Sequence, residues 1–312
     1  MTSLYNRYRP TKLEDVIGQD AVVKSLQAHV KKNNVPEVIL FAGGSGTGKS
    51  TLAKVLVPIV GCSSFDYHEY NCATVESPLG MVQEVERLLG MAKRGGKAIV
   101  WHFEEIGSMS RAKHAQEGLL KLLEFHPPGE YFFLTTTDPD KVLRAIRGRC
   151  TRYDLKPIPV PVLTKLVKDV AVKEKAKLPD AVAMQIAQTA DGSAREALVL
   201  LEKALALSTE SDQLDAVLPP SVKQAAFGLV QAMIYRKSDW KAVAAILRDL
   251  EDDPEQVRNY ILACATTEIL KADPRTSPRA ALVLGEFERN FFDGKRASLV
   301  RAVYDVIRME AR

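Results

Sequence analysis

Hydrophobic residues follow two different patterns along the chain, and the change falls near residue 156. Before it, short apolar runs alternate with stretches that have the spacing of amphipathic helices, the first at about residues 19–32. Such alternation is typical of a parallel sheet covered by helices on both faces, so we predict an α/β domain over residues 1–156. The runs predict four strands, near residues 37–42, 65–70, 97–103 and 131–136.

A proline-rich segment, Lys156-Pro157-Ile158-Pro159-Val160-Pro161, separates this region from a helical one. Closely spaced prolines cannot continue a helix or a central strand, so we expect a domain boundary here. Beyond it the spacing predicts a small helical domain over residues 157–218, with helices at about 161–176, 179–190 and 194–207. A second break at Leu218-Pro219-Pro220 precedes an all-helical region over residues 219–312. One helix face there is predicted to carry Trp240, Val243, Ile246 and Leu247.

Composition narrows the class of protein without naming a function. With 312 residues and 46% hydrophobic residues, the chain is long enough for two or three packed domains. The net charge of +4 permits a polyanionic partner but does not demonstrate one. The four cysteines form no C-x-x-C pair, and no signal-peptide or membrane-length apolar run is found. We expect a cytoplasmic protein with reduced thiols and no membrane partner.

The strongest single signal is an unbroken match to G-x-x-x-x-G-K-[ST] at residues 43–50. It lies between a strand-like segment, 36–41, and a helix-like one, 49–56, which argues against a mere glycine-rich connector. Small residues let backbone N–H groups close around phosphates, while Lys49 reaches the β- and γ-phosphate oxygens and Ser50 holds Mg²⁺. The residues predicted to bind ATP here are Gly43, Gly44, Ser45, Gly46, Thr47, Gly48, Lys49, Ser50 and Thr51.

Paired carboxylates follow the strand predicted at residues 97–103. We assign Glu104 to the Mg²⁺ shell and Glu105 to the attacking water, although a strand can also simply end in solvated acids. Most P-loop proteins have aspartate at the first position, so glutamate at position 104 leaves open whether the site hydrolyses ATP. His102 is expected to be a packed residue rather than a catalytic base. Thr137, after the next apolar strand, is a candidate contact to the γ-phosphate or the water, although threonine is also a good strand residue.

Together these elements resemble the clamp-loader branch of the AAA+ ATPases, over roughly residues 4–207. That branch includes the small subunits of replication factor C, the bacterial tau/gamma subunit and the ATPase subunits of phage clamp loaders. The resemblance implies a RecA-like AAA+ domain, a helical lid and a C-terminal helical collar that holds subunits together. Residues 7–10 and 13–19 resemble the adenine-side segment, which implies that Val16 and Ile17 flank the base. The tau/gamma zinc insertion is missing at residues 61–65, so the layout favours a phage-like or replication-factor-C-like subunit.

The resemblance also implies roles for two arginines. Arg147-Gly148-Arg149-Cys150 is similar to the Ser-Arg-Cys motif, with Gly148 in place of serine, and implies that Arg149 acts in trans as an arginine finger. Residues 192–198 resemble the sensor-2 segment and imply that Arg195 contacts the γ-phosphate from the lid. Judged without the resemblance, Arg149 is an ordinary solvated residue and Arg195 a helix residue paired with a neighbour.

The helix after the paired acids resembles the one that faces DNA in this branch. DNA phosphate contacts are thus implied for Arg111 and Lys113, and for Lys93 and Arg94 at the end of the preceding helix, although basic residues on helices are most often only solvated. Gln116 resembles a residue that couples DNA to the catalytic centre. Residues 75–81 resemble the part of phage loader subunits that lies near the sliding clamp.

The sequence therefore leads to the hypothesis of an ATPase subunit of a DNA sliding-clamp loader, with ATP and Mg²⁺ as cofactors. Such a subunit opens a clamp and loads it on primer–template DNA during replication. Expected partners are copies of itself or another clamp-loader subunit through the collar, the clamp and the DNA, in a bacterial or phage-infected bacterial cytoplasm. The alternatives are a structural loader subunit that binds ATP without hydrolysing it, and another AAA+ machine on DNA, such as a helicase loader or a branch-migration motor.

Overall fold

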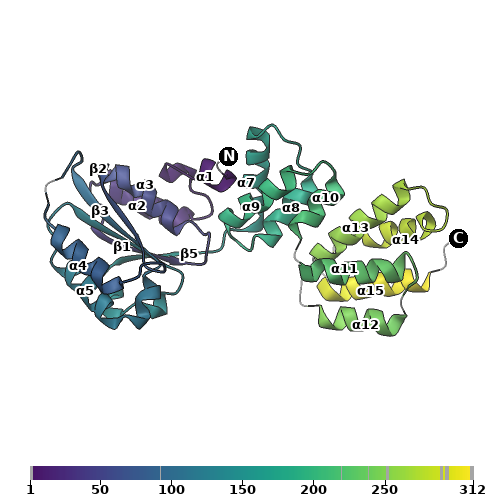
Figure 1. The fold of residues 1–312 in the computed structure, drawn as a ribbon. Helices are drawn as coiled ribbons and strands as arrows, with labels where there is room; N and C mark the ends of the chain where they lie inside the picture. Colours follow the sequence, from purple (N-terminus) through teal and green to yellow (C-terminus); the bar gives the residue numbers. More distant parts are fainter. Residues whose placement is uncertain are drawn as a thin grey trace. The chain divides into compact units, whose positions relative to one another are not determined.

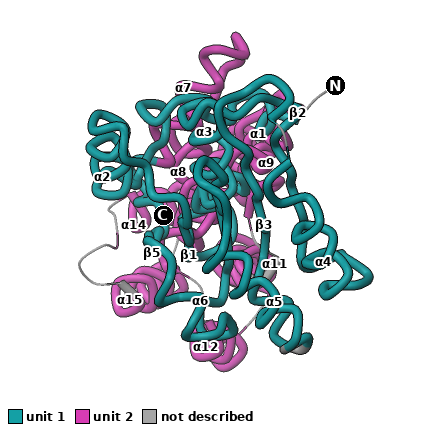
Figure 2. The backbone as a smooth tube through the Cα atoms, turned by 90° about the vertical axis from the view of Figure 1, so that its left-hand side faces the viewer, with its two compact units in different colours: residues 1–162, 192–196 teal, residues 163–191, 197–312 magenta. Residues whose placement is uncertain are grey.

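The computed structural model divides the chain into two compact units. Unit 1 comprises residues 1–162 and 192–196, and unit 2 comprises residues 163–191 and 197–312 (Figure 2). The residues that the structure describes are 3–91, 93–218, 220–237, 239–250, 253–288, 291 and 295–309.

Unit 1 is built on a five-stranded parallel sheet with the strand order β2-β3-β4-β1-β5. Every residue of β3 except Glu104 is buried, as expected for a parallel sheet covered on both faces. The four predicted strands are present, and a fifth, β5, was not predicted. The strands are β1 (Val38–Gly43), β2 (Cys62–Asn71), β3 (Ala98–Glu104), β4 (Glu130–Thr136) and β5 (Thr151–Leu155).

Helices cover both faces of the sheet (Figure 1). On one face, Ile39 of β1 packs in a core with Leu52 of α3, and on the other, Leu40 packs with Leu119 of α5. Successive strand residues point to opposite faces, which is why one strand contributes to two cores. The helical elements of unit 1 are α1 (Leu4–Arg7), η1 (Leu13–Asp15), α2 (Asp20–Lys31), α3 (Lys49–Ile59), α4 (Pro78–Leu88), η2 (Ile106–Arg111), α5 (Lys113–Glu124), η3 (Pro139–Lys141) and α6 (Arg144–Arg149).

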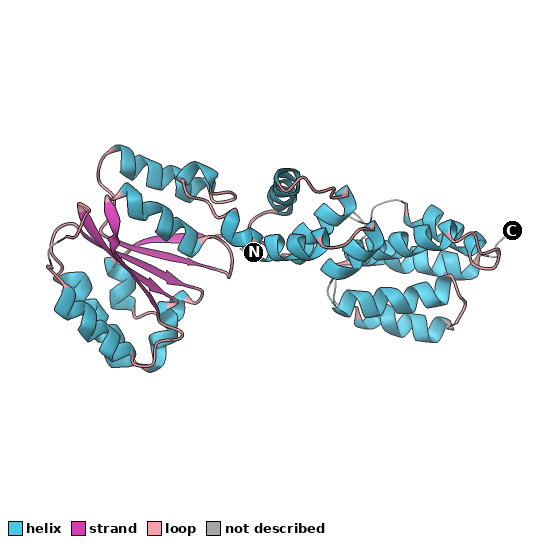
Figure 3. Ribbon diagram, turned by 45° about the horizontal axis from the view of Figure 1, so that its top comes forward, coloured by secondary structure: helices cyan, strands magenta, loops and turns pink. Residues whose placement is uncertain are grey.

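Past β5, all the regular elements in the described part of the chain are helices (Figure 3). The helix α7 begins at Val160, so Pro161 lies inside its first turn, where proline is tolerated because those N–H groups have no helical partner. The helices are α7 (Val160–Lys173), α8 (Asp180–Thr189), α9 (Ala194–Leu205), α10 (Glu210–Val217), α11 (Pro220–Met233), α12 (Trp240–Asp249), α13 (Pro254–Leu270), α14 (Ser277–Phe287) and α15 (Lys295–Arg308). Among the described helices none has the length and apolar character needed to cross a membrane.

Helices α11 to α15 share one hydrophobic core. Val243 and Leu247 of α12 are buried in it together with Phe287 of α14 and Val303 of α15, while Trp240 at the start of α12 is partly exposed. This core matches the all-helical character expected after residue 219. The predicted division into domains of residues 1–156, 157–218 and 219–312 stays a prediction, because the limits of the two compact units do not coincide with the limits of these domains.

Candidate functional site

The glycine-rich loop connects the carboxyl end of β1 to the start of α3. Gly46 and Gly48 have φ angles of 72° and 110°, in the left-handed region that favours glycine. Gly48 is the residue before α3, so the free N–H groups of the first helical turn border the loop. Gly44 and Ser45 form its exposed tip, whereas Thr47 is buried and its hydroxyl donates to the Gly44 carbonyl at 2.9 Å. The geometry is that of an anion-binding loop.

Lys49 is held against this loop by backbone carbonyls. Its Nζ donates to Gly43 O at 2.9 Å and Gly44 O at 2.8 Å, and lies 3.9 Å from Glu105 Oε1. The residue is only 6% exposed. Burial lowers the pKa of Lys49, an effect that Glu105 opposes and Arg195 reinforces. A desolvated ammonium group at this position is well suited to attract a phosphate.

Gln19 anchors the loop, although it was not among the residues predicted for the site. Its Nε2 donates to Thr47 O at 3.3 Å and to Lys156 O at 2.8 Å, and its Oε1 accepts from the Lys156 N–H at 3.3 Å. Gln19 is buried and directly precedes α2. The sequence feature that could have indicated Gln19 is its position between Gly18 and an amphipathic helix. Of the predicted adenine contacts, Val16 is buried in the core and Ile17 is half-buried, and their contact with a base stays a prediction.

The two predicted Mg²⁺ ligands meet in the structure. Glu104, at the end of β3, accepts a hydrogen bond from Ser50, in the first turn of α3. Burial acts to raise the pKa of Glu104, but the hydrogen bond from Ser50 and the charges of Lys54 and Arg9 outweigh it and hold that pKa below its usual value. An ionised carboxylate beside a hydroxyl provides the oxygen ligands that Mg²⁺ prefers, so this pair fits the ion. Arg9 also donates to the Thr51 hydroxyl at 3.3 Å.

Glu105 leaves the strand in a different direction from Glu104. Its φ of 54° lies in the left-handed region, and η2 begins directly after it. Thr137 holds its carboxylate, since Oε2 accepts from the Thr137 N–H at 3.0 Å and hydroxyl at 2.8 Å. The Glu105 N–H donates to the Thr135 hydroxyl at 3.4 Å. Thr137 therefore reaches the predicted catalytic glutamate directly, and its predicted contact to phosphate or water stays a prediction.

Arg195 lies in the part of the chain that returns to unit 1. The preceding Ala194 N–H donates to Gly46 O at 3.2 Å, which brings the start of α9 against the phosphate loop. The Arg195 guanidinium lies over the ring of Tyr5, 5.7 Å from its centroid. Tyr5 was not predicted for the site, and no sequence signal pointed to it. The predicted contact of Arg195 with the γ-phosphate stays a prediction.

Arg149 ends α6 and is 41% exposed at its side chain. It forms an ion pair with Glu124, the last residue of α5, and donates to Ala145 O at 3.2 Å. Within the described part of the chain, these two partners lie on α5 and α6 and not on the phosphate loop. That placement is compatible with the predicted action on a neighbouring subunit.

The predicted DNA and coupling residues lie around α5. Gln116 is buried, with Nε2 donating to Lys141 O at 3.0 Å and Oε1 accepting from the Leu143 N–H at 2.8 Å. Lys93 and Arg94 are exposed, but they do not end a helix as expected. The helix α4 stops at Leu88, because Gly90 has a φ of 75° that turns the chain away. The side chains of Arg111 and Lys113 lie outside the described residues. Their DNA contacts all stay predictions.

Comparisons with known proteins define the class first. The model of the ATPase family associated with various cellular activities (AAA) matches residues 39–157. A solved structure of the Thermotoga maritima RuvB Holliday junction branch migration motor aligns with a TM-score of 0.56 at 22% identity, over 77% of this chain and 85% of that one. This likeness concerns the fold alone. Residues 39–157 thus match the AAA model, and the predicted fold class is confirmed.

Curated relatives narrow the class. DNA polymerase III subunit tau of Bacillus subtilis is 29% identical over 226 residues, which cover 66% of this chain and 40% of the relative. The Escherichia coli tau subunit is 26% identical over 275 residues, covering 79% of this chain and 41% of the relative. The chain therefore spans about two fifths of the length of these relatives. These matches confirm the resemblance to the clamp-loader branch of the AAA+ ATPases.

Proposed function

We propose that the chain is an ATPase subunit of a DNA sliding-clamp loader, which opens a clamp and loads it on primer–template DNA during replication. The observation that carries this proposal is the convergence of Lys49, Ser50 and the acid pair Glu104–Glu105 at one end of the sheet. The similarity to DNA polymerase III tau subunits supports the replicative role. Those relatives are named as subunits of DNA polymerase III, so we propose that this chain also acts together with a DNA polymerase.

Hydrolysis in this proposal follows from the positions of the chain's own groups. The loop N–H groups and Lys49 hold the β- and γ-phosphates, and Ser50 and Glu104 would hold Mg²⁺, whose charge offsets that of the phosphates. Glu105, oriented by Thr137, accepts a hydrogen bond from the attacking water and draws off its proton. The new bond forms between water oxygen and γ-phosphorus, the bond to the β-phosphate oxygen breaks, and ADP and phosphate leave.

A neighbouring subunit completes the site. Arg149 would leave its ion pair with Glu124 and stabilise the charge on the phosphoryl group bound by the next copy. Arg195 would supply a second positive group from the start of α9 in the same chain. Because Arg149 acts only between subunits, hydrolysis depends on assembly through the helical collar, with copies of this chain or with another loader subunit.

Binding to DNA would use the backbone and not the base sequence. Lys93, Arg94, Arg111 and Lys113 are proposed to contact phosphates, and Gln116 to transmit that contact to the catalytic centre. Phosphate neutralisation releases counterions, so binding should weaken steeply with salt.

The main alternative is a structural loader subunit that binds ATP without turnover. Glu104 in place of aspartate favours it, whereas the hydrogen bond from Ser50 to Glu104 and the oriented Glu105 favour hydrolysis. A branch-migration motor is the other alternative, and its only structural support is the shared fold.

Steady-state ATP hydrolysis with Mg²⁺ tests the proposal, using the full chain together with its collar partners, with and without a sliding clamp and primer–template DNA. Stimulation that needs both clamp and DNA supports a clamp loader. ATP binding without turnover under every condition establishes the structural subunit instead. Stimulation by a four-way DNA junction, with no effect of a clamp, establishes a motor.

A further inference from the structure

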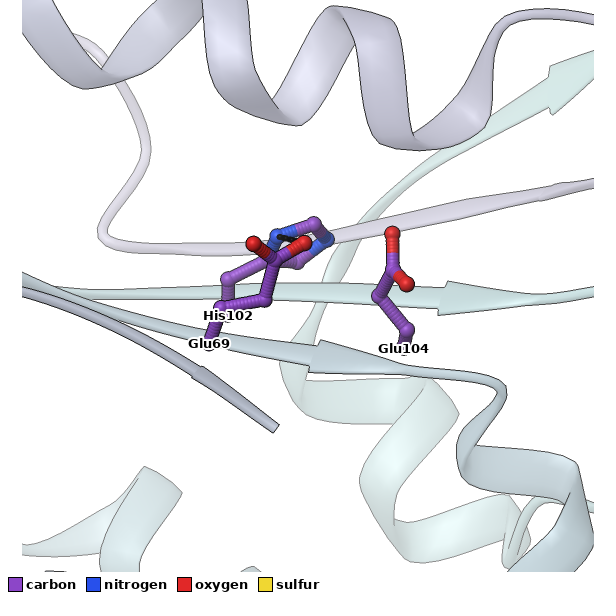
Figure 4. Close-up of side chains that lie close together, drawn as sticks. All are labelled: Glu69, His102 and Glu104. Atoms are coloured by element: carbon purple, nitrogen blue, oxygen red, sulfur yellow. Dashed lines mark ion pairs between the residues drawn. The ribbon is translucent and has the colours of Figure 1, made fainter. Parts of the chain in front are cut away.

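Next to the proposed Mg²⁺ pair lies a second group of potential metal ligands: Glu69, His102 and Glu104 (Figure 4). Glu69 on β2 is the register partner of His102 on β3, and Glu104 follows two residues later on the same strand. Register partners and residues two apart share one face of a sheet, so the three side chains project together. One ligand atom from each residue lies within 4.8 Å of those from the other two.

The hydrogen bonds of His102 leave one nitrogen free. Its Nδ1 lies 2.7 Å from the Tyr67 hydroxyl and 3.6 Å from Glu69 Oε1. A proton on Nδ1 is placed to be donated to the phenol oxygen of Tyr67. With the proton of the neutral ring on Nδ1, Nε2 carries a bare lone pair.

Nothing in the described part of the chain satisfies that lone pair. His102 has no exposed surface, and its Nε2 has no hydrogen-bond partner. In Figure 4 the Glu69 carboxylate overlaps the imidazole and Glu104 lies to the right of the ring. A buried polar atom without a partner is unfavourable, and two carboxylates close to the same ring favour a positive ion among the three side chains.

We propose that Glu69, His102 and Glu104 form a site for a divalent transition-metal ion of the Zn²⁺ type, which shares Glu104 with the Mg²⁺ site of Ser50 and Glu104. An imidazole nitrogen with two carboxylates suits Zn²⁺, whereas Mg²⁺ prefers oxygen ligands alone. The bond from Nδ1 to Tyr67 is the outer contact that usually orients a metal-binding histidine. Three protein ligands leave a further position for water.

Lys54 is the natural competitor for this site. Its Nζ lies 2.7 Å from Glu69 Oε1 and supplies the positive charge that an ion would otherwise bring. Removing the lysine charge should therefore strengthen metal binding. The shared ligand Glu104 gives the site a consequence, because an ion held there draws this carboxylate away from Ser50. Zn²⁺ should thus oppose Mg²⁺-dependent nucleotide hydrolysis.

The test is isothermal titration of the nucleotide-free full chain with Zn²⁺, with Mg²⁺ as a comparison. We expect Zn²⁺ to bind and Mg²⁺ to bind far more weakly. Glu69→Gln and His102→Gln should each weaken Zn²⁺ binding by about tenfold or more, and Lys54→Met should strengthen it. A misfolded protein would not bind more tightly, so Lys54→Met keeps the test valid if His102→Gln fails to fold. His114→Gln, which changes an exposed histidine beside Glu117, should have no effect.

Absorption spectra with Co²⁺ identify the ligands. Nitrogen and oxygen ligands give only weak visible bands, whereas thiolates add an intense charge-transfer band. A thiolate band, or Zn²⁺ affinity unchanged in both Glu69→Gln and His102→Gln, overturns the proposal. Since no nucleotide is present, either result leaves the proposed ATPase function untouched.

Discussion

Thr137 donates both its backbone N–H and its hydroxyl to the same carboxylate oxygen of Glu105, at 3.0 Å and 2.8 Å. The bonds join the ends of two neighbouring strands, β3 and β4, and fix the carboxylate close to Lys49. The orientation of the proposed catalytic glutamate therefore depends on a residue from another strand.

Replacing Thr137 tests this relationship. Thr137→Val should lower ATP hydrolysis by the assembled complex about tenfold to a hundredfold, because the glutamate loses an orienting hydrogen bond, while ATP affinity stays nearly unchanged. Thr137→Ser keeps the hydroxyl and should retain most activity. A loss of ATP affinity in Thr137→Val would instead place the hydroxyl on the phosphate, as considered from the sequence.

Lys49→Ala should abolish ATP binding. The substitution removes the ammonium group that the loop carbonyls of Gly43 and Gly44 hold at the phosphate position. Equilibrium binding of a fluorescent ATP analogue measures the effect, and circular dichroism checks the fold. Normal affinity in this variant would refute the assignment of the loop.

Arg149→Ala should leave the ATP affinity of the isolated chain nearly intact and lower DNA-stimulated turnover in the assembly by about a thousandfold or more. Arg144→Ala provides a matched control, since Arg144 is an exposed arginine on the same helix. ATP hydrolysis in mixtures of Arg149→Ala chains with hydrolysis-deficient Lys49→Ala chains measures whether Arg149 of one chain serves the nucleotide site of another. Equal loss of ATP affinity in the isolated Arg149→Ala chain would show action within one subunit.

Gln19→Ala should both destabilise unit 1 and weaken ATP binding. The substitution leaves the Lys156 N–H and the Thr47 carbonyl without their buried partner, at a cost of about 1–3 kcal/mol in the free energy of unfolding. Urea unfolding and ATP binding are the two measurements. Gln213→Ala is the control, because Gln213 is also buried and bonded to a backbone carbonyl, but lies in unit 2. It should lower stability and leave ATP affinity unchanged.

Acid should destabilise the fold through His102. Burial lowers the pKa of His102 to about 4, against the opposing effect of Glu104 and Glu69 and with help from Lys54 and Arg9. Between pH 6.5 and about 4 the unfolded chain therefore binds a proton that the folded chain does not, and stability falls as the pH falls through this range. His102→Gln should flatten this part of the stability profile, as measured by urea unfolding at several pH values. An unchanged slope would contradict the neutral buried ring.

The sequence predicted those features that are encoded locally. The phosphate loop is contiguous, and its glycines stand where the backbone needs them, while β1, β3 and β4 contain apolar runs and β2 alternates aromatic and polar residues. The strand β5 was missed because charged Arg152 and Asp154 alternate with Tyr153 and Leu155 at the edge of the sheet, next to the prolines. This alternation is the pattern of a half-buried strand, but it spans only five residues and runs directly into the proline-rich segment.

Contacts between distant segments could not be predicted in the same way. Gln19 reaches Lys156 across 137 positions, and Thr137 reaches Glu105 across 32. Such pairs follow from the order of strands in the sheet, which the periodicity of one segment does not specify. The ion pair of Arg149 with Glu124 likewise depends on how α5 and α6 pack.

Gly43 belongs at once to the sheet and to the phosphate loop. It is the last residue of β1, paired with Leu155 of β5, and a side chain at this position would lie 2.5 Å from the Leu155 carbonyl oxygen. Even a methyl group would therefore push β5 away from the neighbouring strand while it reshaped the loop. A substitution at Gly43 therefore changes the phosphate loop and the pairing of β1 with β5 together. Any change that altered nucleotide preference at this position would also require a new arrangement of the sheet edge.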